Sequence, residues 1–478
     1  MRIGVDVGTT FTKAILFGSA NEVVAQRGAR TPLTQRGAGR FECDVDELAA
    51  TVRGLLAGLA VPGIDLIALT GQGDGLWLLD EHGRAVRPAL SWLDARGASV
   101  CEQWARDGVV DAVFKRTANA PFPGAGAALL ASLEESDASA LDAASSATQC
   151  QHALFQSLTG IRTATRSCAT LPVFDPTTLD YADDAVQLLG LARRRHLLPP
   201  IATTSTAIAP LHDELADRLG YERGIRVATG PYDLPATALG IGGLSPGDGV
   251  LILGTTLACE VLVQGAPTSG PPVGLTLCLE RGRLLRAMPA MVGAACIDWV
   301  LRMVRHRHSE LGRLLVESPP GANAVTALPY LSPAGERAPF ADNAARAQLH
   351  GLTLETTAAD IVRAMCEALA YAARQCFAAA GLRGEVVVCG GGSTTPELVQ
   401  LLADVLERPV TLRRGEEIAA LGAVMAADPE TARAATASRE VIAPSAEARY
   451  AEGYADYLNR VATARRHGWR SSEPSASK

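Results

Sequence analysis

Asp6, Gly8, Thr9, Thr10 and Lys13 have the types and the spacing that could act on a phosphate group. A turn of small residues exposes backbone N–H groups and two hydroxyls, with a carboxylate before it and an ammonium group after it. Phosphoryl transfer needs these parts, since donors hold the phosphates and Asp holds Mg²⁺ directly or through water. A motif this short also occurs in ordinary hairpins with a solvated lysine. Alone, it leaves both interpretations open.

A second turn, Gly254-Thr255-Thr256, repeats this pattern between two apolar runs. In the repeat, Ile252 stands at the position of Asp6 and Cys259 at the position of Lys13. The sequence therefore predicts two similar hairpins, with the metal and charge chemistry in one of them. Two similar halves facing each other across a cleft would place both turns on one polyphosphate.

A third small-residue turn, Gly390-Gly391-Gly392-Ser393, follows the apolar run Glu385–Cys389 and precedes a predicted helix over Pro396–Leu406. Glycine lets a flat ring or a phosphate approach the backbone closely, and a helix start favours anions. The alternative is a tight strand–helix turn that binds nothing. Neither the P-loop pattern nor the Rossmann spacing is present.

Asp233 is the carboxylate that could act as a general base, because it precedes a predicted helix near the middle of the chain. A base there could accept the proton of a hydroxyl that attacks a γ-phosphorus. Asp is also a common helix N-cap. Spacing alone favours the N-cap interpretation.

Two further segments carry the mixed polar and aromatic residues that bind neutral polyols: Gln72 and Asp74 among glycines, and Trp92, Asp94 and Arg96. Each hydroxyl of a polyol needs its own partner in such a site. The alternative is a polar loop with a structural Asp94–Arg96 pair. Clustered with Asp233, these carboxylates would disfavour a negatively charged sugar acid.

The predicted elements place these turns in two α/β halves. A strand pair around the first turn, a third strand, a helix over Val45–Leu59 and a buried strand over Ile64–Leu69 follow the order of a ribonuclease-H-like unit. In the second half, Thr357 and Asp360 resemble a capping box that opens a helix extending to about Ala380. We expect domains over 1–243 and 244–430, then a C-terminal helix and a disordered tail over 431–478.

Composition describes an ordinary globular protein of 478 residues, with 48% hydrophobic residues and a net charge of −7. The negative charge argues against nucleic acid or an anionic membrane as the partner. The ten cysteines form no Cys-x-x-Cys pair, so neither a disulfide framework nor a metal cluster is expected. Without a signal peptide or a long apolar run, the sequence predicts a cytoplasmic protein.

Together these segments resemble the FGGY family of carbohydrate kinases, from the N-terminus to about Ala427. Six motifs occur in the family's order: Asp6–Thr10 with Lys13; Gly71–Gly75 with Trp92–Arg96; Gly230–Asp233; Leu253–Thr256; Pro329–Leu331 with Gly335–Phe340, Arg363 and Glu367; and Gly390–Ser393 with Gln400, Ala403-Asp404 and Arg408-Pro409. The resemblance implies two actin-like domains with a catalytic cleft, MgATP, and transfer to a hydroxyl.

The resemblance also implies a role for each residue of the motifs. Asp233 would be the base and Asp6 would position Mg²⁺. The phosphates would contact Thr9, Thr10, Lys13, Gly254, Thr255 and Thr256; adenosine would contact Gly391, Gly392, Ser393 and Gln400; and the sugar would contact Gln72, Asp74, Trp92, Asp94 and Arg96.

The sequence departs from the family in the region that helps to shape the sugar pocket. The segment Gly124–Cys150 is rich in Ala and Ser, and Gln149-Cys150-Gln151-His152 replaces a usual Lys-Asp. The Gln-Gly-Asp-Gly form is nearer the L-xylulose and erythritol kinase branches than the glycerol kinases. These changes leave the substrate open more than the catalysis.

We therefore predict an ATP-dependent kinase of a neutral sugar or polyol, such as a ketopentose or an erythritol-like polyol, whose domains close to exclude water. The oligomeric state is left open, a homodimer being one alternative. Two other functions also remain open: an ATPase of the same superfold acting as a chaperone or filament, and a catalytically silent sugar-sensing module.

Overall fold

The computed structural model describes residues 1–168, 174–203, 206–279, 282–415, 417–430, 440–445 and 450–469. The chain forms two compact units, and it passes between them more than once. Unit 1 comprises Met1–Gly243, Gln264–Leu285 and Glu417–Thr436, and unit 2 comprises Leu244–Val263, Arg286–Glu416 and Ala437–Lys478. Among the described residues, no helix is long and apolar enough to cross a membrane.

Unit 1 is built on a sheet with the strand order β14-β15-β6-β1-β2-β3. The first two strands form the predicted hairpin, and β1 runs parallel to β6, which runs parallel to β15. The strands are β1 (Arg2–Val7), β2 (Phe11–Phe17), β3 (Val23–Arg30), β6 (Leu66–Gly71), β14 (Ile208–Pro210) and β15 (Arg226–Thr229).

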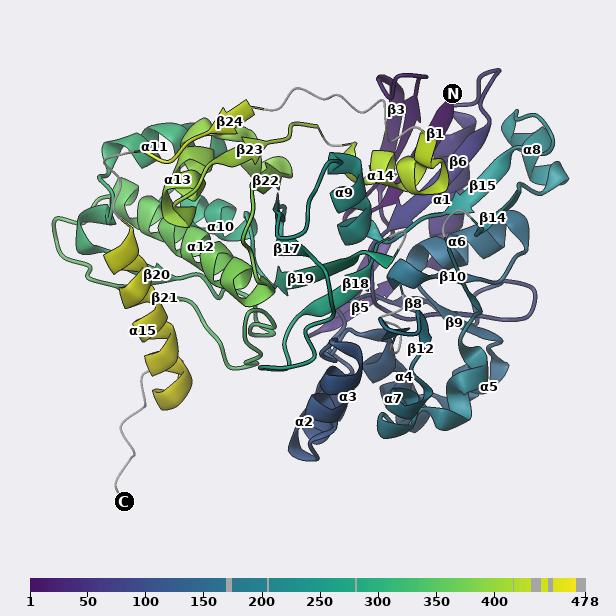
Figure 1. The fold of residues 1–478 in the computed structure, drawn as a ribbon, viewed down its shortest axis with the longest axis horizontal. Helices are drawn as coiled ribbons and strands as arrows, with labels where there is room; N and C mark the ends of the chain where they lie inside the picture. The colour runs from purple at the N-terminus through teal and green to yellow at the C-terminus, as the bar shows by residue number, and fades with distance from the viewer. Residues whose placement is uncertain are drawn as a thin grey trace. The chain divides into compact units, whose positions relative to one another are not determined.

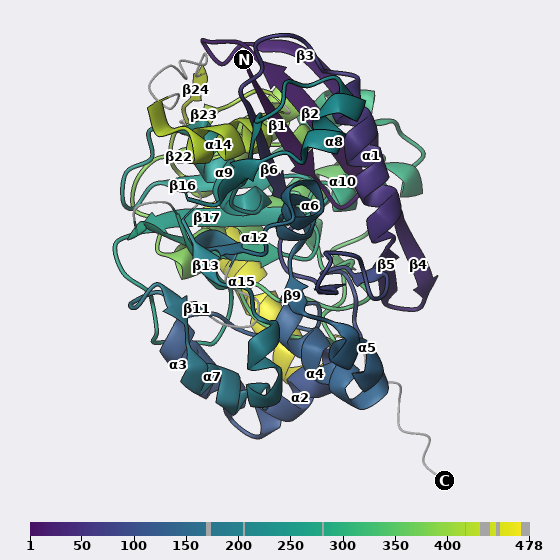
Figure 2. The ribbon, with the colours of Figure 1, turned by 90° about the vertical axis from the view of Figure 1, so that its right-hand side faces the viewer.

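Alternate residues of these strands enter two cores, one on each face of the sheet. Ile3 and Val5 pack in one core with α1, α6 and α8, whereas Ile15 and Phe17 pack in the other with α14. Figure 2 shows α1 and α6 on one side of the strands, with α9 and α14 on the other. The helices are α1 (Val45–Ala57), α6 (Cys150–Thr159), α8 (Asp213–Leu219), α9 (Asp233–Ile241) and α14 (Ile418–Ala427).

Helices α9 and α14 pack with their backbones almost in contact. A Cβ added to Gly240 would lie 1.9 Å from the Ile418 carbonyl oxygen, and one added to Gly422 would lie 1.8 Å from that of Ala236. Glycine at both positions is therefore required by the close approach.

A helical region of unit 1 surrounds a separate apolar core that includes Trp104, Leu129 and Leu130. Helix α4 (Figure 1) supplies Leu129 and Leu130 to this core. The elements are α2 (Ala98–Arg106), α3 (Val109–Thr117), α4 (Gly126–Ser136), α5 (Ala138–Ala143), α7 (Asp183–Leu188), β7 (Trp77–Leu79) and β9 (Ser146–Thr148).

Unit 2 contains a sheet in which β19, β17, β16, β22, β23 and β24 lie side by side in that order. The second predicted hairpin is β16–β17, and β16 runs parallel to β22. The strands are β16 (Gly249–Leu253), β17 (Leu257–Val263), β19 (Leu284–Ala290), β22 (Val386–Cys389), β23 (Val410–Leu412) and β24 (Glu440–Ile442), and β18 (Leu275–Cys278) precedes β19 in the chain.

The long helix α12 (Ala358–Ala380) packs against β17 and is contacted by the other helices of unit 2 (Figure 1). Its predicted capping box is confirmed, since the Thr357 hydroxyl accepts from the Asp360 N–H and Asp360 accepts from the Thr357 N–H. Gly381 ends it with φ +86°. The other helices are α10 (Ala295–Met303), α11 (Leu311–Glu317), α13 (Pro396–Leu406) and α15 (Ala451–His467).

The remaining strands are short. In unit 1 they are β4 (Leu33–Gly37), β5 (Arg40–Cys43), β8 (Ala89–Leu90), β10 (Ala164–Thr165), β11 (Phe174–Asp175), β12 (Asp180–Tyr181) and β13 (Ile201–Ala202), and in unit 2 they are β20 (Thr326–Leu328) and β21 (Gln348–His350). The predicted disordered tail, 470–478, lies outside the described residues.

Candidate active site

The carboxyl ends of β1, β6 and β15 bring three of the predicted segments to one edge of the sheet in unit 1. Asp6 lies opposite Thr70 on the neighbouring parallel strand. The Gln72 N–H donates to the Val7 carbonyl at 2.8 Å, and the Thr70 hydroxyl donates to the Pro231 carbonyl at 2.7 Å. Ligands of open α/β sheets bind at such an edge.

The first Gly-Thr-Thr turn is fixed by its own backbone and by Thr31 at the end of β3. The Gly8 N–H donates to the Phe11 carbonyl at 3.1 Å. The Thr31 hydroxyl donates to the Gly8 carbonyl at 2.8 Å, and the Thr31 N–H donates to the Thr10 carbonyl at 3.1 Å. Sequence analysis missed Thr31, because its contact depends on the pairing of β2 with β3.

Asp6 is a half-buried carboxylate directly before this turn, and Lys13 lies opposite it on β2. Burial raises the pKa of Asp6 to about 6, and Lys13 opposes the rise. Its Oδ1 atom is buried and has no hydrogen-bond partner among the described residues. Such an oxygen suits a metal ligand, and Mg²⁺ usually needs only one or two carboxylates beside phosphates and water.

Gln72, the residue directly after β6, carries a buried amide. Its side chain is buried, and both Oε1 and Nε2 lack a hydrogen-bond partner among the described residues. Buried polar groups normally have partners, so an unsatisfied amide at this position indicates a ligand site. The next residues pack tightly, because a Cβ on Gly73 would lie 2.4 Å from the Tyr232 ring, and Asp74 has φ +57°.

Trp92 joins the sugar-binding candidates to the first turn. Its indole Nε1 donates to the Thr9 hydroxyl at 2.9 Å. On the other side, a Cβ on Gly124 would lie 1.8 Å from the Trp92 carbonyl oxygen, and the Gly75 N–H donates to the Gly124 carbonyl at 3.0 Å. The two predicted sugar-binding segments are therefore neighbours in space.

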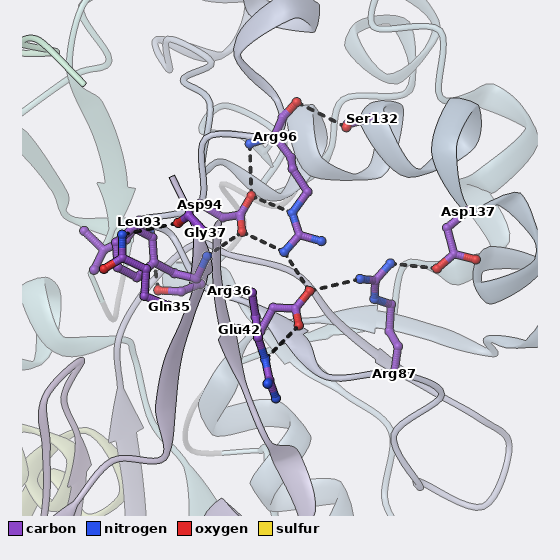
Figure 3. A network of polar contacts seen from close by, with 12 residues as sticks. Gln35, Arg36, Gly37, Glu42, Arg87, Leu93, Asp94, Arg96, Ser132 and Asp137 are labelled. Atoms are coloured by element: carbon purple, nitrogen blue, oxygen red, sulfur yellow. Dashed lines mark hydrogen bonds and ion pairs between the residues drawn. The ribbon is translucent and has the colours of Figure 1, made fainter. Parts of the chain in front are cut away.

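Asp94 and Arg96 form the structural pair that the sequence left open (Figure 3). Asp94 Oδ1 accepts from the backbone N–H and from Nε of Arg96, both at 2.9 Å. Asp94 Oδ2 accepts from Arg96 Nη2 at 2.9 Å and from the Phe41 N–H at 2.8 Å. Both oxygens of Asp94 are thus engaged, which leaves Arg96 as the member of the pair with spare donors.

Asp233 is the first residue of α9, and the N-cap position belongs to Tyr232. Its Oδ1 accepts from the Leu234 N–H at 2.8 Å. The N-cap interpretation of Asp233 is therefore wrong by one residue. The half-buried carboxylate stands at the start of the helix and follows Tyr232, whose ring lies against Gly73.

The start of α6 lies close to both candidate carboxylates. Burial raises the pKa of the Cys150 thiol well above its usual value, and Cys43, Asp233 and Asp6 add to the rise through their charges. His152, two residues later, accepts from the Thr165 N–H at 3.1 Å through Nε2. Sequence analysis noted that residues 149–152 depart from the family pattern, but it did not single out Cys150.

In unit 2, the second Gly-Thr-Thr turn is tighter than the first. The Gly254 N–H donates to the Thr256 carbonyl at 3.1 Å, and Leu253 pairs with Leu257. Three residues lie between the paired ends, against four in the first turn, where Val7 pairs with Thr12. As a result Cys259 lies opposite Leu251 rather than Ile252. The two hairpins therefore share a fold, but the pairing register of the second differs from that of the first by one residue.

The second turn is held by backbone donors at the start of α10. The Gly293 N–H donates to the Thr255 carbonyl at 2.9 Å, and the Ala294 N–H donates to the Gly254 carbonyl at 2.8 Å. A Cβ on Gly293 would lie 2.3 Å from the Thr256 carbonyl carbon. Gly293, which the sequence analysis missed, is required by this approach.

The Gly390–Ser393 turn lies against the same hairpin. Cβ atoms on Gly390 and Gly392 would lie 2.7 and 2.6 Å from atoms of Leu253, whereas one on Gly391 would meet no described atom within 4 Å. Gly391 is thus the glycine that a ring could approach. The Ser393 hydroxyl donates to the Gly390 carbonyl at 2.7 Å and is used within the turn.

Gln400 on α13 is engaged with protein atoms. Its Nε2 donates to Asp404 Oδ1 and to the Ala443 carbonyl, each at 2.9 Å. Asp404 also accepts from the Ser445 N–H at 2.6 Å. In this structure Gln400 therefore fastens the segment 440–445 to α13.

Comparison with known proteins decides the family. Residues 1–240 match the N-terminal domain, and residues 278–428 the C-terminal domain, of the FGGY family of carbohydrate kinases. The chain belongs to this family. It is a carbohydrate kinase, a phosphotransferase of the class that uses ATP with a divalent metal.

The relatives of this FGGY kinase cover nearly its whole length. It is 31% identical over 455 residues to an erythritol kinase of Brucella abortus (strain 2308), covering 89% of this chain and 86% of the relative. It is 27% identical to a xylulose kinase of Escherichia coli (strain K12), with 90% and 91% covered. The sequence prediction of the FGGY family is confirmed.

Solved structures confirm the fold of this kinase. A ligand-bound xylulose kinase from Lactobacillus acidophilus superposes with a TM-score of 0.89 at 20% identity, over 97% of each chain. A xylulose kinase from Rhodospirillum rubrum gives a TM-score of 0.86 at 26% identity, over 98% of this chain and 99% of the other. The predicted ribonuclease-H-like, actin-like fold of the two domains is the fold of these enzymes.

Proposed function

We propose that this kinase transfers the γ-phosphoryl group of MgATP to a hydroxyl of a short neutral polyol or ketopentose, with Asp233 as general base. The observation that carries the proposal is the buried Gln72 amide, whose two polar atoms lack partners among the described residues. An amide offers one acceptor and two donors. Such an amide can bind the hydroxyls of a neutral substrate, whereas the negative charges of Asp74 and Asp233 would repel an anionic substrate.

In this proposal, residues of unit 1 bind the acceptor and start the chemistry. Gln72, Asp74, Trp92 and Arg96 contact hydroxyls or the carbon chain, while Asp94 holds Arg96 in place. Asp233 accepts the hydroxyl proton as that oxygen forms its bond to the γ-phosphorus, and the bond to the β–γ bridging oxygen breaks. The Thr9–Trp92 contact links acceptor binding to the first turn.

The nucleotide is assigned to the three glycine-containing turns. Backbone and hydroxyl donors of Thr9, Thr10, Gly254, Thr255 and Thr256, with the ammonium group of Lys13, hold the phosphates. Gly391, Gly392 and Ser393 border the adenosine, together with Gln400 on α13. Asp6 would hold Mg²⁺, directly or through water, and the bound ion would supply positive charge beside the phosphates. The domain division proposed from the sequence is 1–243, 244–430 and 431–478.

The substrate is tested by measuring ADP release with tetritols, pentitols, ketopentoses, ketohexoses, glycerol and gluconate. We expect a short neutral polyol or a ketopentose to give the highest kcat/KM, and gluconate to give none above background. ADP release that does not depend on any acceptor, or a preference for the acid, would contradict the proposal.

The base is tested with Asp233→Asn, which should lower kcat by about 10²–10⁴-fold while ADP still binds. Asp213→Asn is the matched control, because Asp213 is likewise the first residue of its helix, α8, but is exposed. Near-normal turnover in the Asp233 variant would remove the assignment.

A further inference from the structure

Arg96 is held by two carboxylates in unit 1, and the second of them comes from a strand far from it in the sequence (Figure 3). Asp94 accepts hydrogen bonds from Nε and Nη2 of Arg96, each at 2.9 Å. Glu42 on β5 accepts a hydrogen bond from Arg96 Nη2 through Oε1, at 2.7 Å. Glu42 was not among the residues that the sequence analysis assigned to the site.

The bond to Glu42 engages one more N–H group of the Arg96 guanidinium. Arginine has five N–H groups, one on Nε and two on each Nη. Asp94 and Glu42 together use the Nε hydrogen and both hydrogens of Nη2. The two hydrogens on Nη1 are left, and Nη1 makes no hydrogen bond or ion pair with the residues that the structure describes.

Glu42 is itself fixed by a chain of alternating charges. Its Oε1 is 3.4 Å from Arg87 Nη2, and Arg87 Nη1 is 2.8 Å from Asp137 Oδ2. The side chains of Glu42, Arg87 and Arg96 are only 16–17% exposed, so solvent screens these contacts weakly. Arg36, which is 62% exposed and 3.9 Å away, adds little.

Strand β5 positions both carboxylates that bind Arg96, those of Asp94 and Glu42. The Phe41 N–H donates to Asp94, and the neighbouring Glu42 side chain takes Arg96. Strand β5 also pairs with β8, where Glu42 lies opposite Leu90, two residues before Trp92. The strand therefore sets the orientation of Arg96 within the same segment that carries Trp92.

We propose that Glu42 is a positioning residue for acceptor binding, because its carboxylate fixes the Arg96 guanidinium so that Nη1 donates to one hydroxyl of the polyol. This inference rests on the proposed function, since it requires Arg96 to face the acceptor. Without the Glu42 charge, Arg96 and Arg87 lose their shared partner, and Arg96 is free to rotate about its pair with Asp94.

The test compares steady-state kinetics of Glu42→Gln with those of the parent enzyme. We expect the KM for the best acceptor to rise about tenfold, with kcat within about threefold and the KM for ATP within about twofold. Glu42→Asp, which keeps the charge on a shorter side chain, should restore part of the acceptor affinity. Glu134→Gln is the matched control, because Glu134 also holds an arginine, Arg194, at 2.7 Å.

Deoxy analogues of the polyol distinguish a positioning role of Glu42 from a merely structural role, because only a positioning role makes the loss of kcat/KM depend on one hydroxyl. For the analogue that lacks the hydroxyl bound by Arg96, Glu42→Gln should leave kcat/KM unchanged, whereas for the parent polyol it should fall about tenfold. An equal loss with every analogue would overturn the inference. If Glu42→Gln does not fold, Glu42→Asp carries the same comparison.

Arg96→Lys separates a failure of this inference from a failure of the proposed site. Lysine removes the planar fork, so the acceptor KM should rise at least tenfold. If Arg96→Lys raises it and neither Glu42 variant does, only the role of Glu42 is overturned. If Arg96→Lys leaves the acceptor KM unchanged, the proposed acceptor site is wrong as well.

Discussion

The two Gly-Thr-Thr hairpins share a sequence pattern but differ in turn length and in the contacts that hold them. The first turn has four residues between its paired ends and is held by the Thr31 side chain and backbone. The second has three and is held by N–H groups at the start of α10. A repeated motif thus supplies the same backbone donors twice, while the surrounding structure sets the geometry of each turn.

The hairpins also differ in their chemistry. The first contains a half-buried carboxylate, Asp6, with one buried oxygen that lacks a partner among the described residues, and a lysine opposite it. The second has Ile252 and Cys259 at the equivalent sequence positions. A buried carboxylate oxygen without a partner lowers stability, and its presence in one hairpin supports the proposal that this hairpin holds the metal. Three predictions test this difference.

The largest difference is expected for catalysis. Asp6→Asn should lower kcat by about 10²–10³-fold, because it removes the carboxylate proposed to hold Mg²⁺. Ile252→Asn places the same residue at the equivalent position of the second hairpin, removes no charge, and should lower kcat less than tenfold. The measurement is the initial rate at saturating acceptor as a function of Mg²⁺. Equal losses in the two variants would show that the hairpins are chemically equivalent.

A smaller difference is expected for stability when each glycine gains a methyl group. In Gly8→Ala the Cβ would lie 2.9 Å from the Phe11 carbonyl oxygen, whereas in Gly254→Ala it would lie 3.6 Å from that of Thr256. We expect Gly8→Ala to lower the free energy of unfolding by about 2 kcal/mol and Gly254→Ala by less than about 0.5 kcal/mol. Urea unfolding measures both, and the reverse order would refute the described turn geometries.

The smallest effect is the pH dependence that Asp6 adds to the first hairpin. Its pKa is raised from 3.8 to about 6 in the folded state, so the ionised carboxylate costs stability. The cost is absent below pH 3.8, grows as the pH rises to about 6 and is constant above. With metal removed by EDTA, Asp6→Asn should therefore gain about 1.4 kcal/mol over the parent enzyme between pH 5 and pH 8.

This pH effect is measured as the difference in free energy of unfolding between the two proteins at each pH. Ile252→Asn serves as the control, because it adds or removes no titrating group. A parallel pH profile for Asp6→Asn and the parent enzyme would show that the Asp6 carboxylate is not held in a costly environment.

Much of the fold could be predicted because it depends on local signals. The Thr357–Asp360 capping box and Gly381 bound α12 as expected, and the helix over Pro396–Leu406 matches α13. Both hairpins were found from the apolar runs that flank their glycine-containing turns. These features depend on residues within one turn or one pair of strands, so the chain specifies them without distant contacts.

The contacts that complete the candidate site could not be predicted from local patterns. Thr31 reaches Gly8 only because β3 pairs with β2, and Glu42 reaches Arg96 across 54 positions of the chain. Likewise, α14 packs on β1 in unit 1, although its residues fall in the stretch 244–430 that sequence analysis grouped with the second half. Each of these contacts depends on which strands and helices become neighbours.

The sequence by itself determined the chemistry of this protein: which carboxylates, amides and glycine-containing turns it carries, their order, and hence its family. Only the tertiary structure decided the register of each hairpin, the unsatisfied state of Asp6 and Gln72, and the grip of Glu42 on Arg96. The physical reason is the distance along the chain over which each factor operates. Turn and helix propensities depend on residues within a few positions of one another. Hydrogen-bond satisfaction and burial depend on groups that folding brings together from distant parts of the chain.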